Sequence, residues 1–365
     1  MMLTSCAVKK PIIITEEAEL ELAAAKLTIS NVSVDKKTFN PSQGEVVKIR
    51  YKLSKQANVS MKIYDSDDNL VRVIKSVEID KQGYNEKIWD GKDDAGNILP
   101  REVYIYTIEA ISASGDETYI YDMADETGGI ELTLRGLNFD NKTGQIDYVL
   151  PKAARVRIRI GIKDGGPLLQ TLLDWQPQQA GKHTITWDGM DSSGVMDLLG
   201  NPNIFVNIAS FSLPENSVIL EGGERVGYEK KISTAKRPAK SVTTKKYIHA
   251  LHKRAKCHEP NFDFEILGLK EYNEKGIPLI TQDIIPIRII IDQKDKIDLI
   301  NSRFEIIFFI DNVFIFEEEE GTSPFTYRFD TKGLSQGEHI ITVNIYGFND
   351  HIASRSKRIF IQRKR

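Results

Sequence analysis

The residues of this chain that could do chemistry fall into a few small groups. One acidic turn contains Asp90, Asp93, Asp94 and Asn97, whose oxygen atoms are of the kind that Ca²⁺ prefers. The turn lacks the alternating ligands and the distal Glu that calcium loops use, and its later counterpart carries serines where acids would be needed. We therefore expect no metal at this turn.

A second group gathers His249, His252, Cys257 and His258. A closed zinc site would need all four of these irregularly spaced residues at once. Cys257-His258 also resembles the end of a c-type haem motif, but Arg254 stands where the first cysteine would be. The pattern favours incidental histidines in a basic segment, so we expect neither a metal nor a cofactor.

Other catalytic signatures are missing from the sequence. It contains no Gly-rich phosphate loop, no Gly-x-Ser-x-Gly elbow and no His-Glu-x-x-His motif. The acidic run Glu317 to Glu320 is typical of an exposed hairpin turn, where charge also keeps an edge strand from pairing. We expect no catalytic residues and predict that the chain is not an enzyme.

A repeated sequence pattern predicts the structural elements that carry these residues. Tyr51-Lys52-Leu53 precedes a Trp-Asp-Gly turn, and Tyr148-Val149-Leu150 precedes another at nearly the same spacing. The copies lie roughly a hundred residues apart, which is the size of one β-sandwich domain. The recurring tryptophans are expected to pack over their turns, the aspartates to cap them and the glycines to supply positive φ. The structural turn residues are Trp89, Asp90, Gly91, Gly96, Trp187, Asp188, Gly189 and Gly194.

Short alternating apolar stretches separated by turn residues predict an all-β protein of three Ig-like β-sandwich domains in tandem with a basic linker. A hydrophobic fraction of 41% is enough to build their cores. On one strand of the second copy, the alternating Arg157 and Arg159 suggest a solvated outer face. The expected domains are a stalk at 1–26, sandwiches at 27–112 and 113–213, a basic linker at 214–284 and a third sandwich at 285–365.

The two repeats resemble the Ig-like domain of the flagellar hook-capping protein family. The resemblance rests on a strand ending Tyr-x-Leu, a short strand with an exposed turn, the Trp-Asp-Gly-x-Asp-x-x-Gly turn and a following aromatic strand. It covers about half the chain and implies scaffolding, assembly or attachment rather than catalysis. The hook-capping protein has one such domain, whereas this chain has two copies and a different third domain, so hook assembly is not carried over. The third domain is similar to other bacterial Ig-like domains.

The predicted linker is strongly basic. Between Arg225 and Lys256 it holds eleven Lys or Arg residues against one acid, Glu229. It has few aromatic residues for stacking on bases, and the net charge of the chain is -3, so we expect no nucleic acid. Three roles of this segment stay open. It could bind lipid headgroups, bind an acidic protein surface, or serve as a simple solvated linker. The residues proposed for partner contact are Lys230, Lys231, Lys236, Arg237, Lys245, Lys246, His249, His252, Lys253, Arg254 and His258.

The N-terminal segment Leu3-Thr4-Ser5-Cys6 resembles the lipobox of bacterial lipoproteins. A complete signal would need a basic start and an apolar region before it, so this reading places the true start upstream of Met1. Stable anchoring in a membrane needs more than one acyl chain. A thioether-linked diacyl group and an amide-linked chain on Cys6 would meet that need. No run of about 18 apolar residues predicts a transmembrane helix. The expected location is the outer membrane or cell surface, on the periplasmic or extracellular side.

Together these features predict a non-catalytic scaffold or adaptor lipoprotein that docks protein partners in an envelope assembly through sandwich edges and the basic segment. One alternative is a carbohydrate-binding or adhesion protein, for which Tyr104 and Tyr106 on one side of a strand are the best candidates. A second alternative is an accessory subunit of an envelope enzyme or cytochrome complex.

Overall fold

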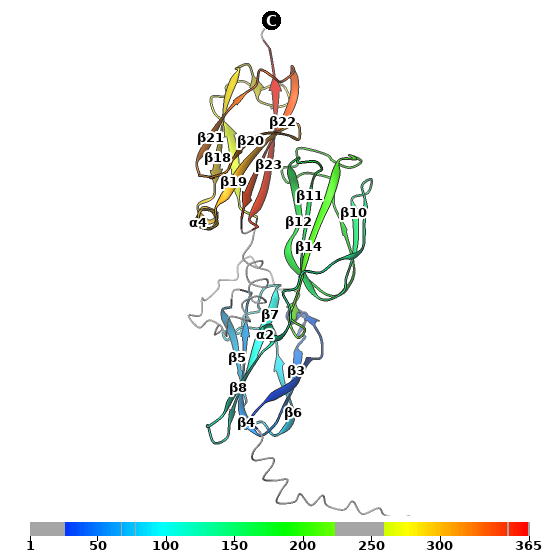
Figure 1. The fold of residues 1–365 in the computed structure, drawn as a ribbon, viewed down its shortest axis with the longest axis vertical. Coiled ribbons are helices and arrows are strands. Elements are labelled where there is room, and N and C mark those ends of the chain that lie inside the picture. Colours follow the sequence, from blue (N-terminus) through cyan, green and yellow to red (C-terminus); the bar gives the residue numbers. More distant parts are fainter. Residues whose placement is uncertain (1–25, 67, 77, 223–258, 349, 364–365) are drawn as a thin grey trace, which may run out of the picture. The chain divides into compact units, whose positions relative to one another are not determined.

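The computed structural model describes residues 26–66, 68–76, 78–222, 259–348 and 350–363 of the chain. The chain divides into two compact units, of which the first holds the N-terminal sandwich and the second holds the other two. The described residues form six β-sheets and little helix, so the predicted all-β class is confirmed (Figure 1). No helix within these residues has the length and hydropathy needed to cross a membrane.

The first sandwich packs a three-stranded sheet against a larger one. The smaller sheet has the order β1-β3-β6, and the larger has the order β2-β15-β7-β4-β5 with β8 paired to β7. Strand β3 shows why the sheets pack: its apolar side chains at every second position are fully buried, while the lysines and arginine between them face outward. The strands are β1 (Ile29–Val34), β2 (Thr38–Phe39), β3 (Val47–Leu53), β4 (Ala57–Tyr64), β5 (Leu70–Lys75), β6 (Gly83–Trp89), β7 (Val103–Ser112), β8 (Thr118–Asp122) and β15 (Val218–Leu220), with the 3-10 helix η1 (Pro41–Gln43).

The second sandwich repeats this plan with two three-stranded sheets, β13-β10-β9 and β12-β11-β14. Its strand β10 carries the second Tyr-x-Leu sequence and pairs with β13, as β3 pairs with β6 in the first copy. The repeat in the sequence therefore corresponds to a repeat in topology. The elements are the short helix α2 (Met123–Glu126), β9 (Arg135–Asp140), β10 (Gln145–Leu150), β11 (Ala154–Ile162), β12 (Leu168–Gln178), β13 (Gly181–Thr186) and β14 (Ile204–Ser212).

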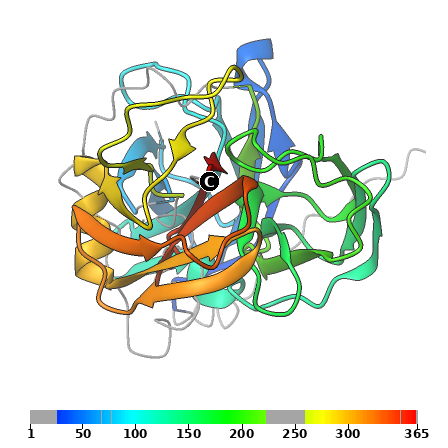
Figure 2. The same ribbon diagram turned by 90° about the horizontal axis from the view of Figure 1, so that it is seen from above.

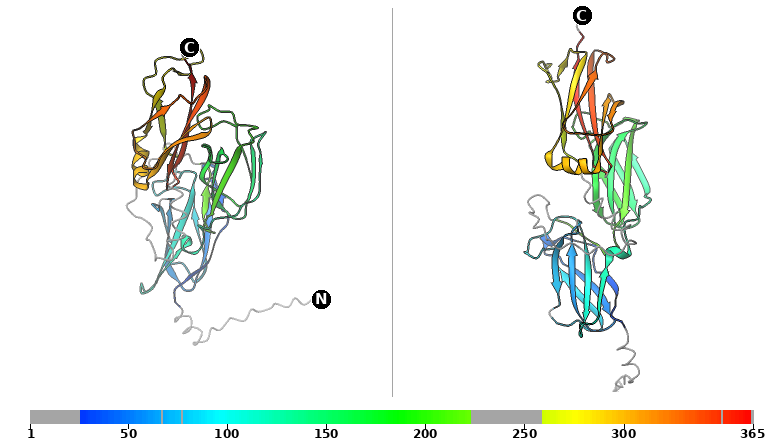
Figure 3. Two further views of the ribbon diagram at one scale, coloured as in Figure 1. Left: turned by 45° about the horizontal axis from the view of Figure 1, so that its top comes forward. Right: turned by 60° about the vertical axis from the view of Figure 1, so that its left-hand side comes forward.

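The third sandwich has sheets of order β16-β18-β21 and β17-β23-β22-β19-β20. Figure 2 shows this sandwich from above, and Figure 3 shows helix α4 at one end of it, where the helix joins β18 to β19. Its core is built mostly from isoleucine and phenylalanine side chains of both sheets. The elements are β16 (Phe262–Ile266), β17 (Leu279–Ile280), β18 (Ile284–Ile291), α4 (Gln293–Ser302), β19 (Phe304–Ile310), β20 (Val313–Glu318), β21 (Phe325–Asp330), β22 (Gly337–Gly347) and β23 (Ile352–Ile361).

The structure moves the predicted boundaries at two places. Strand β16 pairs with β18, so the third sandwich begins inside the stretch 214–284 that we assigned to the linker. Strand β8 pairs with β7, so it belongs to the first sandwich although it follows the predicted boundary after residue 112. The alternation of apolar residues at Phe262, Phe264 and Ile266 predicts a strand, but it carries no information about which sheet accepts that strand.

Candidate functional site

Both Trp-Asp-Gly turns place their tryptophans inside a sandwich. Trp89 is buried with its ring centroid 5.6 Å from that of Phe39 and 5.4 Å from that of Tyr104, and its indole N–H donates to the Lys92 carbonyl at 3.2 Å. Trp187 is buried in the same way and donates to the Met190 carbonyl at 2.8 Å. Each ring therefore closes its own turn against the core and offers no face to a ligand.

The aspartates of these turns accept hydrogen bonds from backbone amides, and the glycines adopt backbone conformations with positive φ. Asp90 accepts from the amide of Lys92 at 3.2 Å, and Asp188 accepts from the amide two residues after it at 2.9 Å. Gly91 and Gly189 have φ of 72° and 86°, and a Cβ there would lie 2.7 Å from Pro41 and 2.4 Å from Leu199, respectively. The second glycines of the turns, Gly96 and Gly194, also have positive φ.

The carboxylates that suggested calcium are bound to protein atoms. Asp93 accepts from the amides of Ala95 at 2.9 Å and Asn97 at 2.8 Å, and Asp94 accepts from the amide of Val73 at 3.1 Å. Within the described residues, no group of three or more His, Cys, Asp or Glu side chains is arranged to hold a metal ion.

The second turn also carries a contact that the first does not. In the second unit, Ser192 Oγ donates to the carbonyl of Ser354 at 2.6 Å, and Ser193 Oγ accepts from the amide of Ser356 at 2.8 Å. Both partners lie on β23, so the turn of the second sandwich is bonded to the backbone of the third. The serines that replace acids in the second copy thus form part of a domain junction.

The prediction of a solvated arginine face on β11 is wrong. Arg159 is only 5% exposed, and Arg155, four residues earlier on the same strand, is also buried. The turn between β22 and β23 covers this face and brings Asp350 against it. The guanidinium groups of Arg157 and Arg159 both donate to the Asp350 carboxylate, the latter at 3.2 Å, and Arg159 also donates to the Asp350 carbonyl at 3.0 Å.

Trp175 completes this cluster. Its indole N–H donates to the Asp350 carboxylate at 3.1 Å, and the Arg157 guanidinium carbon lies 5.0 Å from the centre of the indole ring. One carboxylate therefore accepts hydrogen bonds from two arginines and one indole, which is a strong arrangement because each bond is charge-assisted. We call Arg157, Arg159, Trp175 and Asp350 the junction cluster.

A second set of contacts extends the junction along the sheet. The Asn344 side-chain amide donates to the Leu168 carbonyl at 2.9 Å and accepts from the Leu168 amide at 2.8 Å, which copies the pairing of two strands. Thr342, Asn344, Ser354 and Ser356 are buried polar residues on β22 and β23. Small polar side chains on alternate strand positions are typical of a solvated face, so the sequence alone conceals this contact surface.

Ser335, His339 and Asp311 lie together in the third sandwich but do not form a catalytic triad. His339 Nδ1 lies 2.6 Å from the Asp311 carboxylate, and Ser335 Oγ lies 3.4 Å from Nε2. The same Nε2 is 3.0 Å from the Ser335 carbonyl, which can only accept a hydrogen bond. Nε2 therefore carries a proton and cannot act as the base that a serine nucleophile needs.

This histidine predicts a pH dependence of stability. Burial opposes the charged ring, but the hydrogen bonds to Asp311 and to the Ser335 carbonyl outweigh it and raise the pKa of His339. A raised folded-state pKa contributes stability that is fully present below the unfolded value of about 6.5 and is lost as pH rises through the folded value. The midpoint temperature of the transition that includes the third sandwich should therefore fall as pH is raised from about 6 to 9.

Thermal unfolding of the full chain across this pH range measures the effect. The variant His339→Gln should flatten the dependence, and His183→Gln, in the second sandwich, should leave it intact. An unchanged slope in His339→Gln would assign the pH dependence to another group.

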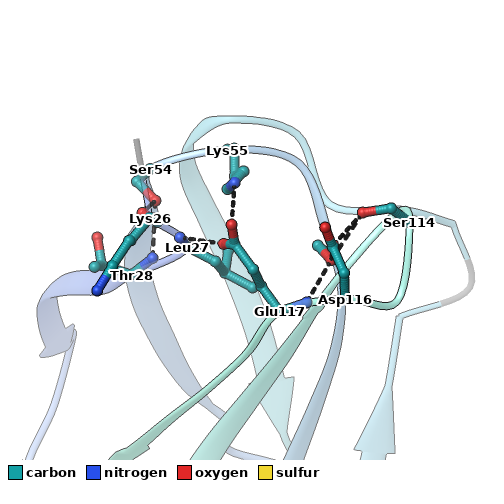
Figure 4. A network of polar contacts seen from close by, with 9 residues as sticks. Lys26, Leu27, Thr28, Ser54, Lys55, Ser114, Asp116 and Glu117 are labelled. Atoms are coloured by element: carbon teal, nitrogen blue, oxygen red, sulfur yellow. Dashed lines mark hydrogen bonds and ion pairs between the residues drawn. The ribbon is translucent and has the colours of Figure 1, made fainter. Parts of the chain in front are cut away.

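The point where the chain enters the first sandwich is held by a polar network, which we call the entry clasp (Figure 4). The Leu27 amide donates to Glu117 at 2.6 Å, and Lys55 donates to the other oxygen of the same carboxylate at 2.8 Å. Ser54 Oγ accepts from the Thr28 amide and donates to the Lys26 carbonyl, both at 2.8 Å. Lys55 and the Leu27 amide hold the pKa of Glu117 below its usual range, so the clasp is charged at neutral pH.

Replacing Glu117 with glutamine should loosen this entry. The variant keeps one acceptor oxygen but loses the charge that attracts Lys55, so hydrogen exchange at the Leu27 amide should become faster while the strands further inside stay protected. Glu131→Gln, a change at an exposed glutamate elsewhere in the chain, is the control. Equal exchange in wild type and Glu117→Gln would show that the clasp does not hold the chain.

Several predicted site residues lie outside the described residues. These are Cys6, proposed for lipidation, and all of the basic and histidine residues proposed for partner contact, from Lys230 to His258. Their roles stay predictions. Sequence reasoning in turn missed the junction cluster, and its signal in the sequence was the three alternating arginines of an otherwise apolar strand.

The fold and these sites define a protein built of tandem Ig-like β-sandwiches whose second and third members are joined by specific polar contacts. Residues 36–115, within the first sandwich, match the FlgD Ig-like domain family, which confirms the resemblance predicted for the first repeat. No match was found among curated proteins.

Solved structures also match parts or most of this chain, at low identity and low TM-score. The crystal structure of FlgD from P. aeruginosa is 24% identical, over 26% of this chain and 70% of that one, with a TM-score of 0.21. Dimeric latent PorU from Porphyromonas gingivalis is 9% identical over 93% of this chain, with a TM-score of 0.21, and this chain spans only 34% of its length. A bacterial ice-binding adhesin is 8% identical over 93% of this chain and 99% of that one, with a TM-score of 0.20.

Proposed function

We propose that this chain is a non-catalytic scaffold or adaptor of the bacterial cell envelope, held to a membrane through Cys6 and docking protein partners on its sandwiches. The observation that carries the proposal is the junction cluster, because it uses buried charge to fix two sandwiches in one unit. Fixed spacing between domains is what a scaffold needs, whereas an enzyme needs a cleft with converging catalytic groups.

The entry clasp supports the anchored part of the proposal. A chain tethered at its N-terminus transmits any load to the first residues of the first sandwich. The clasp binds the backbone of Lys26, Leu27 and Thr28 there through Ser54 and Glu117. The Ig-like family match of the first sandwich is consistent with attachment and assembly modules.

The carbohydrate-binding alternative loses its best candidates. Tyr104 and Tyr106 are each 2% exposed, and the Tyr104 hydroxyl donates to the Pro100 carbonyl inside the first sandwich. Rings enclosed in this way cannot stack on a sugar. No observation within the described residues favours the accessory-subunit alternative.

The anchor is tested by metabolic labelling with a clickable fatty acid in the protein's own cells. The chain has two cysteines, so one can be replaced as the test and the other as its matched control. Wild type and Cys257→Ser should take up label and fractionate with membranes, and Cys6→Ser should do neither. Crosslinking and mass spectrometry of the same material should recover envelope proteins. An unlabelled chain with only cytoplasmic partners would overturn the proposal.

A further inference from the structure

One edge of the third sandwich is open. Strand β20 is the last strand of its sheet, so alternate residues direct their backbone N–H and C=O groups away from β19. Val313 and Phe314 at its start are 65% and 51% exposed. An edge with unpaired backbone groups and exposed apolar side chains can accept a further strand.

Carboxylates line this edge without cations to balance them. Glu317 on β20 lies beside Glu305 on β19, and burial together with Glu317 and Glu319 raises the pKa of Glu305. Within the described part of the chain, none of these three side chains forms an ion pair with a lysine or arginine. The like charges repel one another, so a cation placed here would relieve a cost that already exists.

A cavity of about 640 Å³ lies where β20 ends. Ile300, Phe304 and Phe348 supply its apolar wall, and Phe348 is 67% exposed. Gly321 keeps the adjoining loop close, since its amide donates to the Phe304 carbonyl at 2.8 Å and a Cβ would lie 2.4 Å from the Phe304 ring. A strand added along β20 would therefore place one of its end residues against the apolar wall of this cavity.

Side chains of both charges line the same cavity. Lys296 and Arg303 contribute from α4 and from the residue after that helix, and Glu305, Glu319 and Glu320 also line it. The cations and carboxylates of the cavity offset one another, whereas positive charge on a bound segment is favoured along β20, next to Glu317.

We propose that β20 and this cavity bind an extended, basic segment of a partner protein by strand addition, with Lys or Arg residues against the edge carboxylates and one large apolar residue in the cavity. The carboxylates also select the partner, because an apolar or acidic strand would leave them at the contact without a counter-charge. The inference rests on the proposed scaffold function and names the chemistry of its partner.

The test uses the full chain and labelled synthetic peptides in which Lys alternates with Val before a terminal Phe. Control peptides replace the lysines with Glu or the terminal Phe with Ala. Fluorescence anisotropy should show saturable binding of the basic peptide, weakened by salt and by loss of the Phe. Hydrogen exchange should show protection confined to β20. The double variant Glu317→Gln/Glu319→Gln should bind about five- to tenfold more weakly, as expected for two exposed ion pairs.

The double variant Glu271→Gln/Glu274→Gln removes the same charge at exposed positions before β17 and should bind like wild type. Equal weakening in both double variants would reduce the effect to net charge and overturn the site, as would binding without protection of β20. A chain that binds the peptide only after its own segment 225–256 is replaced by a neutral linker would overturn the partner as the occupant in favour of the chain's own segment. Cys6 labelling is read separately, so failed peptide binding with an acylated Cys6 would reject this site and leave the anchored scaffold standing.

Discussion

Asp350→Ala is expected to uncouple the second and third sandwiches. The side chain accepts from Arg157, Arg159 and the Trp175 indole, so its removal takes the shared charged acceptor away from three donors at a buried contact. Removing one partner of a buried ion pair costs about 3 kcal/mol or more, because the remaining charge stays desolvated. Calorimetry of the full chain should show the second and third sandwiches unfolding together in wild type and at separate temperatures in the variant.

Two further variants sharpen this result. Asp350→Asn keeps an acceptor oxygen for Trp175 but removes the charge, so it should give an intermediate separation of the transitions. Asp298→Ala removes an exposed carboxylate from α4 and should leave the profile unchanged. If Asp350→Ala and Asp298→Ala gave the same profile, the junction cluster would not be what couples the sandwiches.

The sequence predicts the strands of this protein much better than the contacts between its domains. Val47, Ile49, Tyr51 and Leu53 alternate with charged residues, and the structure buries all four. Alternation works here because a half-buried strand must place every second side chain in its own core. The copy of this strand in the second sandwich follows the same rule, so the repeat in sequence predicts the repeat in fold.

The arginines of β11 and the serines of the second turn make contacts that alternation cannot predict. Alternation says that Arg157 and Arg159 face away from the core, and that much is true. It does not say what lies over them, since Asp350 is almost two hundred residues away and belongs to another sandwich. Ser192 and Ser193 likewise have the composition of an exposed turn, and only the structure shows their bonds to β23. Contacts between domains leave no local periodicity to detect.

Trp89→Ala and Trp187→Ala should be among the most destabilising single changes in their sandwiches. Both rings are almost fully buried, and truncating a buried tryptophan to alanine costs about 3–5 kcal/mol through lost packing and the cavity it leaves. Trp89→Phe retains an aromatic ring but loses the bond to the Lys92 carbonyl, so it should cost less. Tyr84→Ala, at a side chain 72% exposed in the same sandwich as Trp89, should cost under about 1 kcal/mol. Chemical denaturation followed by circular dichroism measures each of these.

The two tryptophan variants should nevertheless differ in how many sandwiches they affect. Trp89→Ala removes support from a turn whose polar groups bond within the first sandwich. Trp187→Ala removes it from the turn that carries Ser192 and Ser193, so the bonds from that turn to β23 should be lost as well. We therefore expect Trp187→Ala to lower the transition of its own sandwich and to separate it from that of the third, while Trp89→Ala lowers only the transition of the first. If Trp187→Ala left the second and third sandwiches coupled, Asp350 and its arginines would hold the junction without help from the turn.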